Sequence, residues 1–138
     1  MKVGSFILVA IVCFVACSDS EYRSAENVVD LSISFSDPIW DGKKVPKRGQ
    51  CTNCQGEGLS PPMLISNIPE KTDFLIVEYK DKTMGVFHGA IRFQVSGKGE
   101  FSIPSIREQT FKLPQGVEVE AEHTAPIGSP GAYMAPCG

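Results

Sequence analysis

The chain has 138 residues and a formal net charge of −3 at neutral pH, with 13 Lys and Arg residues against 16 Asp and Glu residues. A chain of this length has room for one domain with one core. Because its only basic cluster is the short group Lys43, Lys44, Lys47 and Arg48, nucleic acid is excluded as an expected partner.

Residues 1–16 are predicted to be an export signal. Lys2 precedes an apolar run over positions 6–17, which is shorter than the roughly 20 residues that a membrane span needs. The end of this run, Phe-Val-Ala-Cys at 14–17, resembles the bacterial lipobox, in which the cysteine is lipidated before the signal is cut. We therefore expect lipid attachment at Cys17, with an ordinary secretory signal or a short anchor as the alternatives.

The resemblance to a lipoprotein implies where the protein is located. Lipidation of Cys17 would supply more than one acyl chain, which makes attachment to a membrane stable. The next residue is Ser18 rather than Asp, and by resemblance to lipoprotein sorting in Gram-negative bacteria this favours the outer membrane. We expect an exported protein that is lipid-anchored in the envelope and faces the periplasm, with residues 17–27 as a tether and residues 28–138 as the domain.

Period-two alternation of apolar and polar residues predicts the first strands. Positions 29–35 alternate Val, Leu, Ile and Phe with Asp and Ser, which predicts a strand with one buried face. After turn-rich segments, positions 65–69 form a short extended piece and positions 74–79 a buried strand. Across positions 86–95, alternation places Phe87, Ile91 and Phe93 on one face and His88 on the other.

Further alternation follows at positions 111–113 and 117–121, where glutamates at 118, 120 and 122 form a face that we expect to be solvated. The sequence has no helical stripe of useful length and no internal repeat. Short strands separated by Pro and Gly turns predict an all-β fold, an antiparallel β-sandwich.

The loop CQGEGLSPPML at 54–64 is predicted to be stiff and shaped. Pro61 and Pro62 fix φ and force the preceding residue into extended geometry, while Gly56 and Gly58 permit tight turns. Loops of this kind close a fold or build a site.

Three cysteines, Cys51, Cys54 and Cys137, remain after Cys13 is assigned to the signal and Cys17 to the lipid. In an oxidising compartment we expect one disulfide, from Cys51 or Cys54 to Cys137, which would stabilise a small domain by about 2 to 5 kcal/mol. The C-x-x-C spacing also admits a redox pair or structural zinc. No helix start is signalled for a redox pair, and zinc would need Cys137 and a histidine as further ligands.

With these elements in order, the chain resembles the phosphatidylethanolamine-binding family, which includes the Raf kinase inhibitor proteins and their small bacterial relatives. Bacterial members carry Cys-x-Gly-x-x-x-Ser-Pro-Pro-Leu followed by Val-Pro or Ile-Pro, and this chain has CQGEGLSPPM at 54–63 and Ile-Pro at 68–69. The family's Asp-Pro-Asp is Tyr-Lys-Asp at 79–81, and its strand histidine is His88. The family's Gly-Tyr-x-Gly-Pro-Cys-Pro-Pro is similar to GAYMAPCG at 131–138.

The resemblance implies a β-sandwich with a small pocket for phosphate-like or carboxylate anions, such as phospholipid headgroups. His88 would donate to the anion, more strongly in its charged form, and Asp81 would accept from a headgroup amine or orient His88. Pro62 would form a pocket wall, and the hydroxyl of Tyr133 would reach the rim. The family's last strand, Gly-x-His-Arg-Tyr, has no counterpart here, so we expect a pocket without that strand.

The resemblance therefore implies a binding protein that is not an enzyme and carries no cofactor or metal. The sequence offers no Ser-His-Asp order, no metal set and no Gly-rich phosphate loop to which catalysis can be assigned. The alternative function is a protein-interaction or inhibitor module, because the family includes kinase and peptidase inhibitors that act through surface contact.

Overall fold

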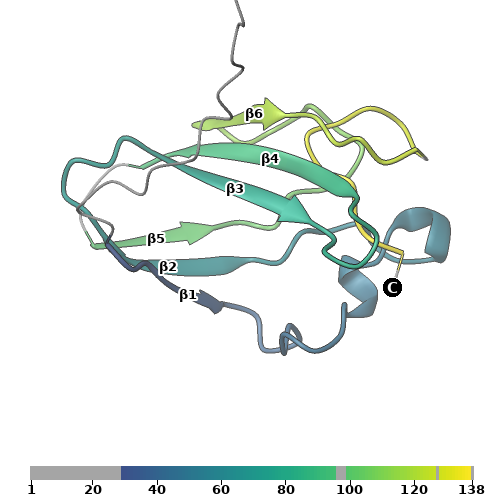
Figure 1. Ribbon diagram of the computed structural model, residues 1–138, viewed down its shortest axis with the longest axis horizontal. Helices are drawn as coiled ribbons and strands as arrows, with labels where there is room; N and C mark the ends of the chain where they lie inside the picture. Colours follow the sequence, from purple (N-terminus) through teal and green to yellow (C-terminus); the bar gives the residue numbers. More distant parts are fainter. Residues whose placement is uncertain (1–28, 96–98, 127, 138) are drawn as a thin grey trace, which may run out of the picture.

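The described residues form two antiparallel three-stranded sheets (Figure 1). The computed structural model describes residues 29–95, 99–126 and 128–137, so the predicted signal, lipidated Cys17 and tether lie outside the described residues. One sheet has the order β1-β2-β5 and the other β3-β4-β6. The strands are β1 (Ser32–Phe35), β2 (Met63–Ile68), β3 (Phe74–Lys80), β4 (Phe87–Gln94), β5 (Gly99–Ile103) and β6 (Val117–Ala121).

The prediction of an all-β fold is confirmed. Apart from the 3-10 turns η1 (Lys47–Gly49) and η2 (Thr52–Cys54), the described residues form no helix. The described residues therefore contain no helix long and apolar enough to cross a bilayer.

The core lies between the two sheets. β2 and β5 contribute Met63, Ile65 and Ile103, while the central strand β4 contributes Ile91 and Phe93, both 0% exposed. The inward face predicted for β4 between Ile91 and Val95 is thus confirmed. The layers are also joined by edge-to-face contact of Phe93 with Phe101, whose ring centroids lie 6.4 Å apart. Burial of such aromatic and branched side chains is the main favourable term in folding.

Two predictions of buried strand faces are wrong at the sheet edges. The first strand begins only at Ser32, and all four of its residues are exposed, including Ile33 at 62%. β3 buries Leu75 but leaves Ile76 58% exposed. Both strands are edge strands, with a neighbour on one side only, so less of their surface is covered than predicted.

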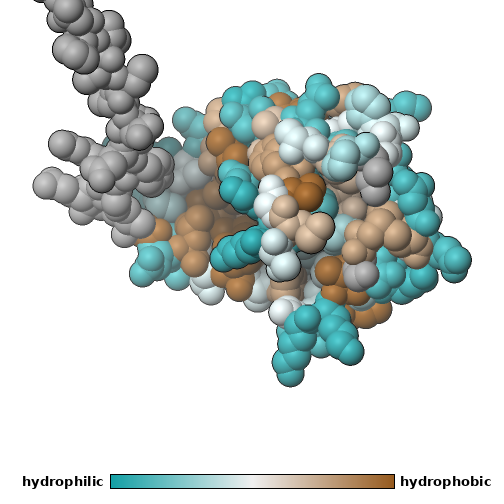
Figure 2. Space-filling view, turned by 45° about the vertical axis from the view of Figure 1, so that its right-hand side comes forward, coloured by the Kyte–Doolittle hydropathy of each residue, from teal (hydrophilic) through white to brown (hydrophobic). Residues whose placement is uncertain are grey.

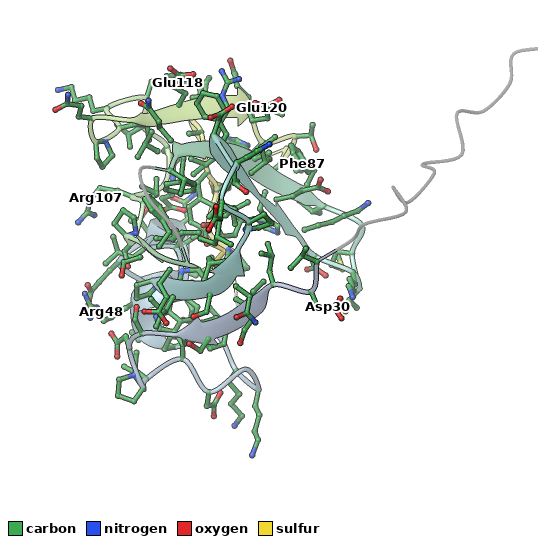
Figure 3. The ribbon with its side chains drawn as sticks, turned by 90° about the vertical axis from the view of Figure 1, so that its left-hand side faces the viewer. Asp30, Arg48, Phe87, Arg107, Glu118 and Glu120 are labelled. Carbon is green, nitrogen blue, oxygen red and sulfur yellow. A yellow bond between two sulfur atoms is a disulfide. The ribbon has the colours of Figure 1, made fainter. Side chains whose placement is uncertain are left out.

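The remaining differences concern the later strands. β5 was not predicted, although Phe101 and Ile103 alternate there with Glu100 and Ser102, and residues 111–113 form no strand. The solvated glutamate face of β6 is confirmed, since Glu118 and Glu120 lie at the surface (Figure 3) and both pair with Arg92 of β4.

Candidate functional site

A β-bulge between β3 and β4 positions His88. Tyr79 pairs with Gly89 and the next residue, Lys80, pairs with Phe87, so His88 is the extra residue between them. Gly89 has φ of +114°, which glycine adopts without the penalty of a side chain. The bulge interrupts the alternation predicted for this strand: Phe87, expected on the buried face, is only half-buried and is not part of the core. The imidazole of His88 lies outside the core, as predicted, and turns toward the buried C-terminal segment.

The hydrogen bonds of His88 fix the orientation of its ring and place a proton on one of its nitrogens. Its Nδ1 lies 2.6 Å from the carbonyl oxygen of Met134, and because a carbonyl only accepts, Nδ1 carries a proton. The amide of Met134 in turn donates to the backbone oxygen of His88 over 2.9 Å. Among the described residues Nε2 has no hydrogen-bond partner, so this nitrogen is available to a ligand.

Tyr133 lies in the buried segment that precedes Cys137. It is 2% exposed, and its backbone oxygen accepts from the amide of Gln109 over 2.9 Å. Its ring packs edge to face on Tyr79 of β3. Burial raises the pKa of both phenols, and for Tyr133 the neighbouring Tyr79 and Glu108 raise it further. Both phenols are therefore neutral across the physiological range.

Asp81 caps the turn between β3 and β4. Its Oδ1 accepts from the amides of Thr83 at 2.7 Å and Met84 at 3.0 Å. These bonds, that of Met84 first, lower the pKa of the carboxyl group, and His88 adds a smaller Coulombic contribution in the same direction. Asp81 is consequently an ionised carboxylate held beside the imidazole.

A cavity of about 510 Å³ brings three of the four predicted ligand-binding residues together: Asp81, His88 and Tyr133. Pro61 lines it and Pro62 does not, so the prediction of Pro62 as the wall is wrong by one position. Neighbouring residues of an extended segment point in opposite directions, and the Pro62 carbonyl accepts from the amide of Ser36 next to β1. The remaining lining includes Trp40, Glu78, Tyr79, Lys80 and Pro136.

A second hollow, of about 240 Å³, shares Asp81, His88 and Pro136 with the first and extends to Met84, Met134 and Cys137. His88 therefore borders two hollows. A third cavity, of about 320 Å³, lies between the edges of the two sheets, and its lining is apolar except for Glu78. The charged and polar side chains that could bind a ligand therefore lie around His88 rather than in this apolar cavity.

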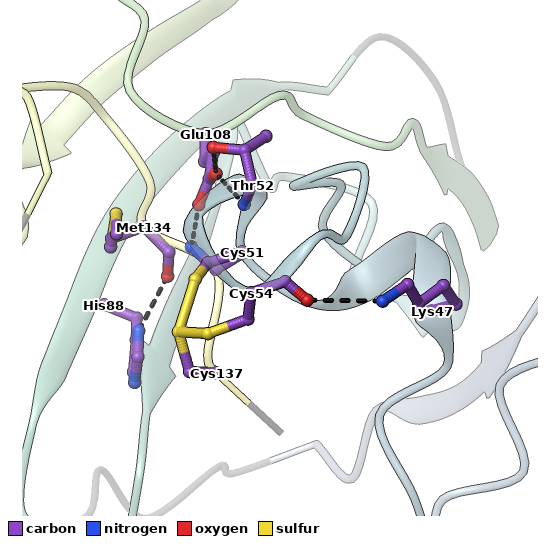
Figure 4. The surroundings of a disulfide bond; sticks show 9 residues. Lys47, Cys51, Thr52, Cys54, His88, Glu108, Met134 and Cys137 are labelled. Carbon is purple, nitrogen blue, oxygen red and sulfur yellow. Dashed lines mark hydrogen bonds between the residues drawn. A yellow bond between two sulfur atoms is a disulfide. The ribbon is translucent and has the colours of Figure 1, made fainter.

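Glu108 is a site residue that the sequence analysis missed. It is 4% exposed, and its Oε1 accepts from both the amide and the hydroxyl of Thr52 at 2.7 Å. Its Oε2 accepts from the amide of Ala135 at 3.0 Å (Figure 4). The carboxylate thus joins the turn after Cys51 to the segment before Cys137. It stands in the polar run Arg-Glu-Gln-Thr, where nothing in the pattern signals burial.

The predicted proximity of the cysteines is confirmed, and the choice of pair stays open. The Cα atoms of Cys51 and Cys137 lie 5.3 Å apart, and those of Cys54 and Cys137 lie 5.8 Å apart. Both distances suit a disulfide. Because one sulfur carries only one disulfide, Cys137 can be joined to one of the two at a time.

Comparisons with family models, with curated proteins and with solved structures found no match to this chain.

Proposed function

We propose that the protein is a non-catalytic binding protein whose pocket around His88 takes a small ligand with a phosphate-like or other anionic group. The observation that carries this proposal is the convergence of Asp81, His88 and Tyr133, from separate parts of the chain, on one cavity. Its volume of about 510 Å³ falls within the range of small-molecule sites, about 300 to 1,000 Å³.

The charges around the cavity favour a ligand with two ends of opposite sign. Lys80 and a charged His88 would attract an anionic group, and the free Nε2 would donate to it. Glu78 and Asp81 would accept from an amine on the same ligand. A phosphoethanolamine headgroup has this chemistry, and it is the ligand class that the resemblance to the phosphatidylethanolamine-binding family implies.

The finer statements about fold and location belong to the same proposal. A sandwich of the phosphatidylethanolamine-binding type is compatible with two facing antiparallel sheets. Attachment through Cys17 would hold the pocket near the membrane surface, in the outer membrane on its periplasmic side. There the cavity would meet phospholipid headgroups or soluble phosphorylated compounds.

Binding is tested by NMR and thermal unfolding with phosphate, ethanolamine and phosphoethanolamine in turn. We expect saturable amide shifts around His88, with phosphoethanolamine binding more tightly than either half. The variant His88→Gln should lose the response. The control His123→Gln should keep it, because His123 bonds to the Ser129 carbonyl and does not line the cavity. Absence of any response in the unmodified protein would refute the proposal.

A second candidate, a protein-interaction or inhibitor module, is favoured by the apolar surface of the sheet edges. Hydrophobic side chains reach the surface between hydrophilic ones (Figure 2). Ile33 of β1 and Phe74 and Ile76 of β3 are 62%, 47% and 58% exposed. Inhibition of a purified peptidase or kinase that His88→Gln retains and Ile33→Lys abolishes would support this candidate over the anion pocket.

A further inference from the structure

The sulfurs of Cys51, Cys54 and Cys137 form one cluster. All three Sγ atoms lie within 4.8 Å of one another, and the sulfur of Cys137 stands between the other two (Figure 4). Either member of the C-x-x-C pair has a Cα distance to Cys137 that suits a disulfide. One cysteine of the cluster is therefore always left as a thiol next to the disulfide of the other two.

Hydrogen bonds hold the cluster together independently of any disulfide. The amide of Cys51 donates to the carbonyl of Pro136 over 2.9 Å. Glu108 joins Thr52 to Ala135, the residues adjacent to the C-x-x-C turn and to the Cys137 end. None of these bonds uses a sulfur atom, and both Cα distances to Cys137 suit a disulfide in this one backbone arrangement.

The two members of the C-x-x-C pair differ in access to solvent. Cys51 is 0% exposed, whereas Cys54 and Cys137 are exposed. The Nζ atom of Lys47 bonds to the carbonyl oxygen of Cys54 over 3.2 Å, which helps to hold the backbone of this exposed cysteine in place. Because Cys137 takes part in either disulfide, Cys54 is the exposed cysteine that can be left as a thiol for an external reagent, and Cys51 reacts only through its neighbours.

We propose that these three cysteines form a thiol–disulfide exchange site that reacts with external disulfides through Cys54. In the reduced protein, the Cys54 thiolate attacks one sulfur of the external disulfide, forms a mixed disulfide and releases one external thiolate. The Cys137 thiolate then attacks the Cys54 sulfur, forms the Cys54–Cys137 bond and releases the second external thiolate. The two protein thiols have lost two electrons and two protons, which the external disulfide has gained.

The third cysteine restores the reactive thiol. The Cys51 thiolate attacks the Cys137 sulfur, so that the Cys51–Cys137 bond forms and Cys54 leaves as a thiolate, with no net change in electrons. The disulfide is then joined to the buried Cys51, and the exposed Cys54 is available again. A single disulfide with an unrelated third thiol would not have this property.

Disulfide mapping of the unmodified protein tests the proposal. The reduced protein is oxidised with an equimolar amount of oxidised glutathione, quenched in acid and mapped by mass spectrometry. Both the Cys51–Cys137 and Cys54–Cys137 bonds should be found. Iodoacetamide is then added to the folded, oxidised protein. Because it traps only the exposed thiol, label should accumulate on Cys54 while the Cys54–Cys137 bond is lost with time.

Several results would overturn the proposal: a Cys51–Cys54 bond, a single pairing, or a Cys54–Cys137 fraction that persists under iodoacetamide. Protection of all three thiols from alkylation by stoichiometric zinc would overturn it in favour of a metal site. In the control Cys51→Ser, the Cys54–Cys137 bond should form and persist under iodoacetamide. In Cys54→Ser, the mixed disulfide with glutathione should be lost. The mapping of the unmodified protein decides the question even if a variant fails to fold.

Discussion

The rings of Tyr79 and Tyr133 meet edge to face, with their centroids 4.9 Å apart and their planes at 60°. This contact joins β3 to the C-terminal segment, which no strand pairing reaches. Both rings line the cavity beside His88, so the same contact that closes the core also forms a wall of the candidate site. Aromatic pairs of this kind contribute about 0.5 to 1.5 kcal/mol beyond their buried area.

Alkaline pH should unfold the protein through these phenols. Their pKa values are raised in the folded state by burial, so their contribution to stability is complete below the ordinary tyrosine pKa of about 10 and is lost as pH rises above it. Denaturant unfolding at increasing pH should show a falling free energy of unfolding. Tyr133→Phe should flatten this dependence, and an unchanged slope would contradict the assignment.

Gly89→Ala should disrupt the bulge that positions His88. A Cβ at this position would collide with the backbone oxygen of Ala132, and φ of +114° is unfavourable for alanine. We expect a loss of about 1 to 3 kcal/mol in the free energy of unfolding, together with displaced His88 resonances. Gly99→Ala is the matched control, since its φ is also positive but nothing lies within 4 Å of the added Cβ. Equal losses in both variants would attribute the effect to φ alone.

Glu108→Gln should weaken the junction between the C-x-x-C turn and the C-terminal segment. The glutamine side chain keeps the shape of glutamate, but its NH2 group replaces one acceptor oxygen with a donor. That donor would face the backbone N–H of either Thr52 or Ala135, which is itself a donor. Since hydrogen bonds to charged groups contribute about 1.5 to 3 kcal/mol each, thermal or denaturant unfolding should show a loss of that order. The same change at exposed Glu118, which pairs with Arg92 at the surface, should cost less than about 1 kcal/mol.

Anion binding should depend on the imidazole of His88. Nδ1–H is already given to the carbonyl of Met134, so Nε2 is the ring nitrogen that remains for a ligand. The dissociation constant for phosphoethanolamine, measured by calorimetry, should increase in His88→Gln. In His123→Gln it should be unchanged, because His123 does not line the cavity. An affinity that His88→Gln leaves unchanged would mean that Nε2 does not contact the ligand.

The local pattern of apolar and polar residues was sufficient to predict much of the fold. Alternation around β4 predicted the buried faces of Ile91 and Phe93, and alternation around β6 predicted the solvated Glu118 and Glu120, because a strand's side chains point to opposite faces whatever surrounds it. Alternation overstated the burial of β1, and β3, predicted as a buried strand, is covered on one face only. Whether a strand lies at an edge depends on its neighbours, and those come from distant parts of the chain.

For the candidate site too, some residues could be predicted from the sequence and others could not. The resemblance to the phosphatidylethanolamine-binding family implied Asp81, His88 and Tyr133, and the cysteine count pointed to the three cysteines, since each is a short signal within one segment. Only the tertiary structure decided that Pro61 rather than Pro62 forms the wall, that a bulge interrupts the strand at His88, and that the carboxylate of Glu108 is buried. Each of these depends on contacts between segments far apart in sequence, and a buried charge is stable only where such segments supply its hydrogen-bond donors.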